Sequence, residues 1–425
     1  MNHLNYFEPY ENKKTSHEDQ LTRAFLVVMR FVPLVQATFL DLVREAQQRN
    51  GSEHIVPSLT TIDSECSIET QVSTIAQEEG TLVSILMTDE HWVPENAIGA
   101  SERGARYDGV IYYSPGWILV IENKLSSANV WEGQLSPSLP QDSLIKVERV
   151  LVDIPWRLLI DRLNSLLERK LVNGAECLLV EDFLEFVDGN FPFLNPYGSF
   201  SQCKGRGFLL KKRCVAIMES IAPGRLRRRQ GGDSHIILAN GPATDAYFYP
   251  DRDYRETGEN GEWRVAINIF PGDTIAQARK FFENVRRDEF LALEEKGWNI
   301  VPNLHFAFIT THLYWAKGTK MSPREYFESW SGDDEIGQIH RNKHDFQLYF
   351  QQLQDDGQIS QADFIELAGI FTNTKKQTIN TCPGFRVSFS WSKAEAEQAD
   401  VQRGRFAEVV RFRMLEALAT WGQTL

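Results

Sequence analysis

One stretch, "RYDGVIYYSPGWILVIENKL", constrains the chain more than any other. Two apolar runs flank a Ser-Pro-Gly turn signal, which predicts a β-hairpin. With these three residues as the loop, Tyr113 lies opposite Trp117, and the same register places Asp108 opposite Glu122. Side chains alternate between the two faces of a strand, so Lys124 shares the face of Glu122. The sequence therefore predicts two carboxylates and a lysine together at the open end of the hairpin.

Such an arrangement is unfavourable without a counter-charge, because like charges directly opposite across two strands repel. A divalent cation bound by the carboxylate oxygens removes the repulsion, and Mg²⁺ prefers oxygen ligands. Lys124, one pleat further along, places an ammonium where it can hold a water molecule or a phosphate. The simpler alternative is a surface ion pair between Glu122 and Lys124 at a strand end.

The pattern of Asp108, thirteen residues, then Glu122-Asn123-Lys124 resembles the signature of the PD-(D/E)XK nuclease superfamily. The resemblance implies an α/β, restriction-endonuclease-like core, a mixed sheet flanked by helices, built in the order helix, three strands, helix, strand. It implies a Mg²⁺ or Mn²⁺ ion bound by Asp108, Glu122 and the carbonyl of Asn123. Lys124 would position or activate the attacking water. Tyr107 stands where the family name has Pro, and the resemblance covers roughly residues 15–160.

Three further residues match positions that some members of the superfamily use. Glu18 would be the acid on the first helix, Glu69 an acid on the first strand, and Gln134 the glutamine that opens the next helix. Each has a plainer explanation. Glu18 can serve as a helix-capping acid, Glu69 can be an exposed strand residue, and Gln134 can lie on a helix surface.

The chain is long enough for two or three domains. A stretch rich in Gly, Pro and Ser between two regularly patterned segments predicts three parts. Residues 1–190 form the nuclease-like domain, residues 191–235 a basic connecting segment rich in Gly, Pro and Ser, and residues 236–425 a C-terminal α+β domain that recognises a target, partner or ligand.

Within these parts the patterns predict individual elements. We expect a long helix over 15–50 with a break at Pro33, a strand over 143–154 and a helix over 155–174. Residues 81–88 fit a strand or a helix equally well. In the second half we expect two strands within 244–270 and one helix from Asp273 or Thr274 to Gly297.

Charge is distributed unevenly along the chain. With 45 basic and 58 acidic residues the net charge is −13, which opposes non-specific binding of the whole molecule to nucleic acid. Residues 204–229 instead hold nine basic residues and one acid. This basic tract predicts phosphate contacts, unless it is a solvated loop or pairs with acids of the same chain. The candidate nucleic-acid contacts in it are Lys211, Lys212, Arg213, Arg225, Arg227, Arg228 and Arg229.

The five cysteines are widely spaced and contain no CxxC, so neither a disulfide framework nor a zinc knuckle is expected. A polar N-terminus and the lack of a long apolar run favour a cytoplasmic protein without a membrane partner. The leading hypothesis is a Mg²⁺- or Mn²⁺-dependent endonuclease, acting on DNA in preference to RNA, in prokaryotic genome defence. An inactive nuclease fold that serves as a binding or scaffold protein is the alternative, and an RNA-directed nuclease is a third. A homo-oligomer or a defence-system partner protein stays open.

Overall fold

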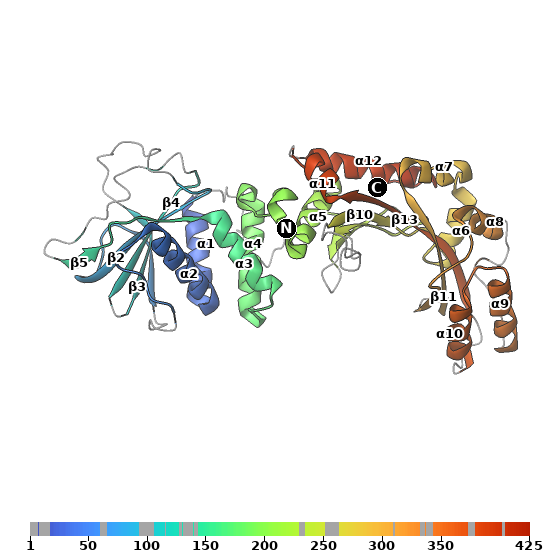
Figure 1. Ribbon diagram of the computed structural model, residues 1–425, viewed down its shortest axis with the longest axis horizontal. Helices are drawn as coiled ribbons and strands as arrows, with labels where there is room; N and C mark the ends of the chain where they lie inside the picture. The colour runs from blue at the N-terminus through green and yellow to red at the C-terminus, as the bar shows by residue number, and fades with distance from the viewer. Residues whose placement is uncertain are drawn as a thin grey trace. The chain divides into compact units, whose positions relative to one another are not determined.

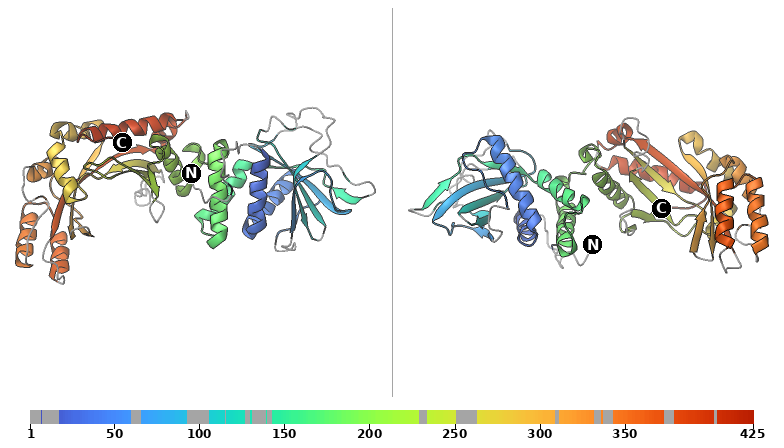
Figure 2. Two further views of the ribbon diagram at one scale, coloured as in Figure 1. Left: turned by 180° about the vertical axis from the view of Figure 1, so that it is seen from behind. Right: turned by 60° about the horizontal axis from the view of Figure 1, so that its bottom comes forward.

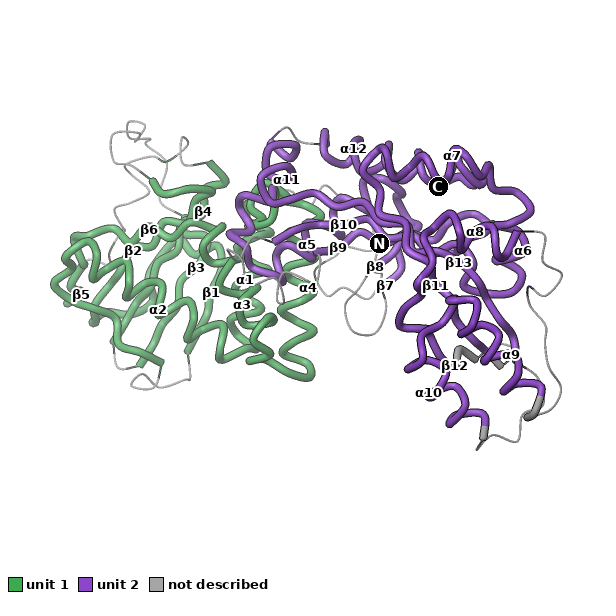
Figure 3. Tube along the Cα trace, turned by 45° about the vertical axis from the view of Figure 1, so that its right-hand side comes forward, with its two compact units in different colours: residues 1–198 green, residues 199–425 purple. Residues whose placement is uncertain are grey.

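The protein is described from a computed structural model (Figure 1). The structure describes residues 7, 18–59, 66–92, 106–114, 116–126, 130, 139, 143–228, 234–250, 263–308, 311–331, 336, 343–372, 379–401 and 404–425. The chain divides into two compact units, Met1–Gly198 and Ser199–Leu425 (Figure 3). Both units combine helices with a β-sheet, so the mixed α/β class predicted from the sequence is confirmed.

The first unit contains four helices and six strands within the described residues. The helices are α1 (Glu18–Phe31), α2 (Pro33–Asn50), α3 (Trp156–Glu168) and α4 (Gly174–Asn190). The strands are β1 (Cys66–Val72), β2 (Glu79–Thr88), β3 (Tyr107–Tyr113), β4 (Trp117–Asn123), β5 (Leu144–Val147) and β6 (Val152–Pro155).

The sheet of the first unit is mixed, with the strand order β1-β3-β4-β2-β5, and β6 also pairs with β2. β1, β3 and β4 are antiparallel, whereas β2 runs parallel to β4, β5 and β6. The predicted hairpin is confirmed in its register, since Tyr113 pairs with Trp117 and the ladder continues to Gly109 and Ile121. The next two positions are Asp108 and Glu122.

The structure decides one open assignment for this sheet and corrects another prediction. Residues 81–88 form a strand, β2, and this strand precedes the hairpin in sequence yet lies between β4 and the short strands β5 and β6. The predicted strand over 143–154 is two strands, β5 and β6, which pair with successive parts of β2. The simple order of three strands, helix and strand is therefore interrupted by β2.

The helices of the first unit cover one face of its sheet (Figures 1 and 2). Side chains from α1, α2, α3 and α4 pack there against Ile85, Ile111 and Ile121. The opposite face carries a smaller cluster that includes Val110 and Val120. Asp108 and Glu122 belong to this second face, because each lies two residues further along its strand.

The expected break in the first long helix lies at Pro33, which begins α2 after an extended Val32. Proline lacks the N–H that would continue α1 and fits the first turn of a new helix. In the described part of the chain no single helix is long and apolar enough to cross a membrane. α1 and α2 reach that composition only as a pair bent by 116°.

The second unit is an α+β domain, as predicted. Its helices are α5 (Gly207–Ile221), α6 (Ile275–Asn284), α7 (Arg287–Leu291), α8 (Pro323–Trp330), α9 (Lys343–Asp355), α10 (Gln361–Thr372), α11 (Lys393–Ala399) and α12 (Arg405–Ala419). Its strands are β7 (Leu226–Arg228), β8 (Ser234–Ile237), β9 (Asp245–Pro250), β10 (Arg264–Ile269), β11 (Asn299–Phe308), β12 (Thr311–Trp315) and β13 (Asn380–Ser392).

The second sheet is antiparallel throughout, with the order β12-β11-β13-β10-β9-β8-β7. The predicted strand pair within 244–270 is confirmed as β9 and β10. The helix expected over 273–297 is two helices, α6 and α7, because Val285 is extended. Its predicted start is confirmed, since the Thr274 hydroxyl caps α6 by accepting from the N–H of Gln277, whereas Gly297, with a φ of 87°, ends a short 3-10 helix, Glu294–Lys296, and not α7.

The predicted connecting segment, residues 191–235, is not a separate part of the chain. Residues 191–198 belong to the first unit, and the basic residues after them belong to the second. α5 packs against β9, and β7 forms the edge of the second sheet. Apolar side chains of α5, including Leu210 and Ile217, are buried, so this segment is structural despite its charge.

Candidate functional site

The candidate site lies at the open end of the β3–β4 hairpin. Asp108 and Glu122 lie there, one position beyond the last pair, Gly109 and Ile121. Both carboxylates are almost fully buried, with exposed fractions of 7% for Asp108 and 6% for Glu122. Buried apolar residues follow Asp108 on β3 and precede Glu122 on β4, because the hairpin is part of the core. Burial of two acids on one face is costly without compensation, so their immediate partners decide what the site can do.

Asp108 accepts hydrogen bonds at both carboxylate oxygens. The backbone N–H of Asn123 donates to Oδ2 at 2.8 Å, and Nε2 of Gln71 donates to Oδ1 at 3.3 Å. Both donors are uncharged. They fix the orientation of the carboxylate, and neither brings a positive charge to it.

Lys124 connects the second carboxylate to the first helix. Its Nζ lies 3.1 Å from Oε1 of Glu122 and 3.1 Å from Oε1 of Glu18. One ammonium therefore serves two carboxylates. The structure brings Glu18 into the site from the start of α1, which agrees with its predicted place, although its observed partner is Lys124.

The resemblance gives a role only to the carbonyl of Asn123. Its side chain, however, makes hydrogen bonds to two helices. Nδ2 donates to the Glu18 carbonyl and to Oγ1 of Thr22, each at 2.9 Å. Oδ1 accepts from Nε1 of Trp156 at 2.7 Å. These contacts join β4 to α1 and α3, and they hold the Asn123 backbone, and hence its carbonyl, in place.

Burial and the charges of neighbouring acids raise the pKa of both opposed carboxyls. Desolvation is the main cause of the rise in the pKa of Asp108 to about 6, and the charges of Asp19 and Glu18 add to it. Desolvation and then the charge of Asp108 raise the pKa of Glu122 to about 7. Burial lowers the pKa of Lys124, but the Glu122 and Glu18 carboxylates outweigh this, and its pKa is raised.

This donor set fits a divalent cation with oxygen ligands. The charges of Glu18 and Asp19 act on Asp108, those of Asp108 and Glu18 act on Glu122, and Lys124 is the cation that acts on both. In the described residues no three His, Cys, Asp or Glu side chains form a ready-made metal cluster. The fit therefore depends on two carboxylates and a backbone carbonyl, the set that the resemblance implies, with water as the remaining ligand.

One predicted residue, Glu69, is not brought into this cluster. Glu69, on β1, pairs with Val110 of β3, which lies two residues from Asp108. The side chain of Glu69 is exposed. The alternative of an exposed strand acid describes it better. Gln134 lies outside the described residues.

Gln71, Thr22 and Trp156 were missed by sequence reasoning. Gln71 lies two residues after Glu69, so the same alternation that placed Glu69 on the Asp108 face could have identified it. Nothing in the local pattern marks Thr22 or Trp156, because their contacts depend on how α1 and α3 pack on the sheet.

The basic tract divides into residues with and without structural partners. Arg213 makes a two-pronged ion pair with Asp400, which is 3% exposed, and Arg225 donates to the Ile237 carbonyl at 2.7 Å. Arg213 is therefore used within the fold, and its interpretation as a phosphate contact is corrected, whereas Arg225 uses one of its N–H groups there. Arg227 is exposed on the edge strand β7. Arg229 lies outside the described residues.

Two further members of the tract lie on α5. Lys211 is exposed, and the ammonium of Lys212 lies 5.6 Å from the ring centre of Phe208. Both also make other interactions within the chain, so neither is a clear phosphate contact.

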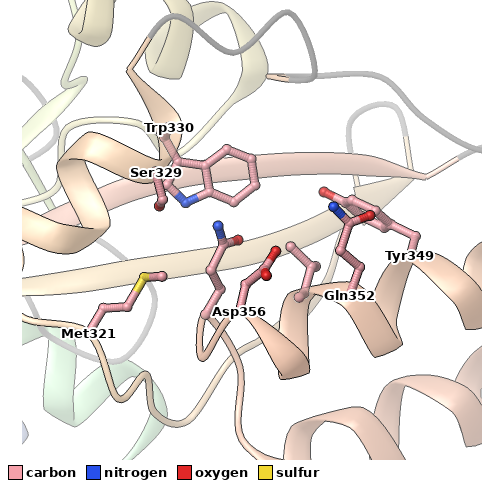
Figure 4. Close-up of a pocket in the computed structure, with 8 residues that line it drawn as sticks. Met321, Ser329, Trp330, Tyr349, Gln352 and Asp356 are labelled. Atoms are coloured by element: carbon pink, nitrogen blue, oxygen red, sulfur yellow. The ribbon is translucent and has the colours of Figure 1, made fainter.

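The second unit contains a cavity of about 350 Å³ between α8 and α9 (Figure 4). Trp330 and Tyr349 form aromatic walls, and Met321 and Asp356 lie at its rim. Asp356 is the charged side chain among the residues that line it, and it is acidic. The cavity therefore does not suit a phosphate.

Compared with known proteins, the chain matches no protein-family model, no curated protein and no solved structure. A function for the chain must therefore be inferred from the geometry of the site and from the sequence pattern.

Proposed function

We propose that this protein is a divalent-metal-dependent nuclease of the PD-(D/E)XK type, with its active site at Asp108, Glu122 and Lys124. The observation that carries the proposal is the pair of buried carboxylates, Asp108 and Glu122, at opposed positions with raised pKa values. Asp108 and Glu122 are buried together, and the ammonium that pairs with Glu122 is shared with Glu18, so a further cation would offset the remaining negative charge.

Each residue has a separate task in the proposed mechanism. Asp108, Glu122 and the Asn123 carbonyl would hold Mg²⁺ or Mn²⁺. The ion would make water more acidic and offset the charge that builds on a phosphodiester. Lys124 stays protonated at neutral pH because its pKa is raised. It therefore orients the water or the scissile phosphate as a hydrogen-bond donor and does not act as the general base.

The wider biological proposal rests on the resemblance alone. It comprises DNA as the preferred substrate, a role in prokaryotic genome defence and a cytoplasmic location. The second unit would recognise a target, a partner protein or a small ligand, and its cavity is the place for the last of these. Exposed Arg227 on β7 is the best-placed described member of the basic tract for a phosphate contact.

The test is a cleavage assay on plasmid, linear DNA and RNA with Mg²⁺ or Mn²⁺, and with EDTA as the control. We expect cleavage in the wild type and its loss in Asp108→Asn, Glu122→Gln and Lys124→Met. Glu45→Gln is the matched control, because it removes the charge of an acid that pairs with Arg162 on the surface of the same unit. Full activity in Glu122→Gln would refute the assignment.

The substrates and metals also separate the other hypotheses. Cleavage of RNA but not of DNA would identify the RNA-directed nuclease. A wild type that binds nucleic acid but cleaves none of the substrates with either ion would favour the inactive scaffold.

A further inference from the structure

Gln71 has a backbone conformation that is unusual for its place in the fold. Its φ is 58°, the left-handed region that side chains with a Cβ avoid. Lys170 and Lys204 share this conformation among the described residues other than glycine, but both follow a helical segment, where it is common. Gln71 lies inside strand β1.

The same residue interrupts the ladder next to the candidate site. Thr70 pairs with Gly109 and Val72 pairs with Tyr107, so Gln71 and Asp108 face each other where the ladder is open. The side chain of Gln71 uses this opening, since its Nε2 donates to Oδ1 of Asp108. The strained backbone and the contact with the carboxylate belong to one residue.

Glycine or asparagine would adopt this conformation at lower cost. Glycine has no side chain, and asparagine is one methylene shorter, so neither supplies the same donor. Glutamine gives an uncharged donor that fixes one oxygen of Asp108 without neutralising it, while the N–H of Asn123 fixes the other. Strain kept at a functional carboxylate is a recognised sign of pre-organisation.

We propose that Gln71 is a positioning residue, which orients Asp108 for the divalent cation. The inference rests on the proposed function. Hydrogen-bond partners of metal-ligating carboxylates typically change metal affinity by about 10–100-fold when they are removed. We expect a loss of that size.

Two variants separate the hydrogen bond from the strain. Gln71→Met keeps the length of the side chain and the strained backbone but has no donor. Gln71→Gly has no donor and relieves the strain. Lys170→Gly is the matched control, because it relieves the same conformation in the same unit away from the site. Thermal melting in EDTA and across a Mg²⁺ series at fixed ionic strength gives the stability and the metal affinity of each protein, and cleavage is measured in parallel.

We expect both Gln71 variants to bind Mg²⁺ about 10–100-fold more weakly than wild type and to cleave more slowly. Gln71→Gly should melt at or above the wild type in EDTA, and Gln71→Met below Gln71→Gly. Lys170→Gly should retain the wild-type response to Mg²⁺. Wild-type affinity in both Gln71 variants would overturn the inference and leave the proposed function intact. A wild type that does not respond to Mg²⁺ would overturn the proposed function and this inference with it.

Discussion

Nε1 of Trp156 donates a hydrogen bond to Oδ1 of Asn123 at 2.7 Å, and both residues are completely buried. This bond joins the first residue of α3 to the last residue of β4. It holds the middle residue of the Glu-Asn-Lys motif against the helical layer. The motif is therefore supported by the core as well as by its charged neighbours.

Loss of this support should destabilise the first unit. Asn123→Ala leaves the Trp156 N–H without its acceptor, and each buried group left unsatisfied costs about 1–3 kcal/mol. Asn164→Ala is the control, because Asn164 is equally buried but bonds only within its own helix at Ile160. Urea denaturation should show the larger loss for Asn123→Ala. Equal losses would mean that the bond to Trp156 adds no stability.

The opposed carboxyls should make the metal-free protein less stable as the pH rises. The pKa values of Asp108 and Glu122 rise from 3.8 and 4.5 to about 6 and about 7 on folding. The folded state thus binds more protons than the unfolded state between about pH 4 and pH 7, and stability falls across this window. Compared with the double variant Asp108→Asn/Glu122→Gln in EDTA, the wild type should lose stability up to pH 7 and then level off. A relative gain for the wild type would contradict these pKa directions.

Divalent metal should reverse the cost of the opposed charges. A ligand at 100 times its dissociation constant that binds only the folded state adds about 2.7 kcal/mol. We therefore expect the wild type to melt higher as Mg²⁺ is raised at fixed ionic strength, and more so at pH 8 than at pH 6, because protons compete at Asp108 and Glu122. Asp108→Asn should equal or exceed the wild type in EDTA and respond little to Mg²⁺. Parallel responses in the two proteins would show that the ion does not lie between these carboxylates.

The basic tract should separate into structural and binding residues. Arg213→Ala leaves the Asp400 carboxylate buried and unpaired, which costs about 3–5 kcal/mol. Reversal of Arg227, Arg228 and Arg229 to Glu should change stability little. It should weaken nucleic-acid binding and reduce its salt dependence, because fewer counterions are released. Melting curves and salt titrations of binding distinguish the two classes, and an unchanged salt slope would mean that the reversed residues are merely solvated.

The sequence by itself determined the hairpin that carries the site. A turn signal between two apolar runs, together with the strict alternation of side chains, fixes which residues face each other. The register that pairs Tyr113 with Trp117 followed from these local rules. The break at Pro33 and the helix start at Thr274 are local in the same sense.

Tertiary structure decided everything that joins distant segments. β2 lies beside β4 although it precedes the hairpin, and Arg213 finds its partner at Asp400. Neither contact can be predicted from the composition or from the spacing of apolar residues. Pairing between distant segments depends on how whole layers of the fold pack. The same holds for the strained Gln71, whose left-handed backbone has no local cause such as a glycine or a turn. The sequence thus specified which charges meet in the hairpin, and the packing of the layers decided which neutral groups hold them in place.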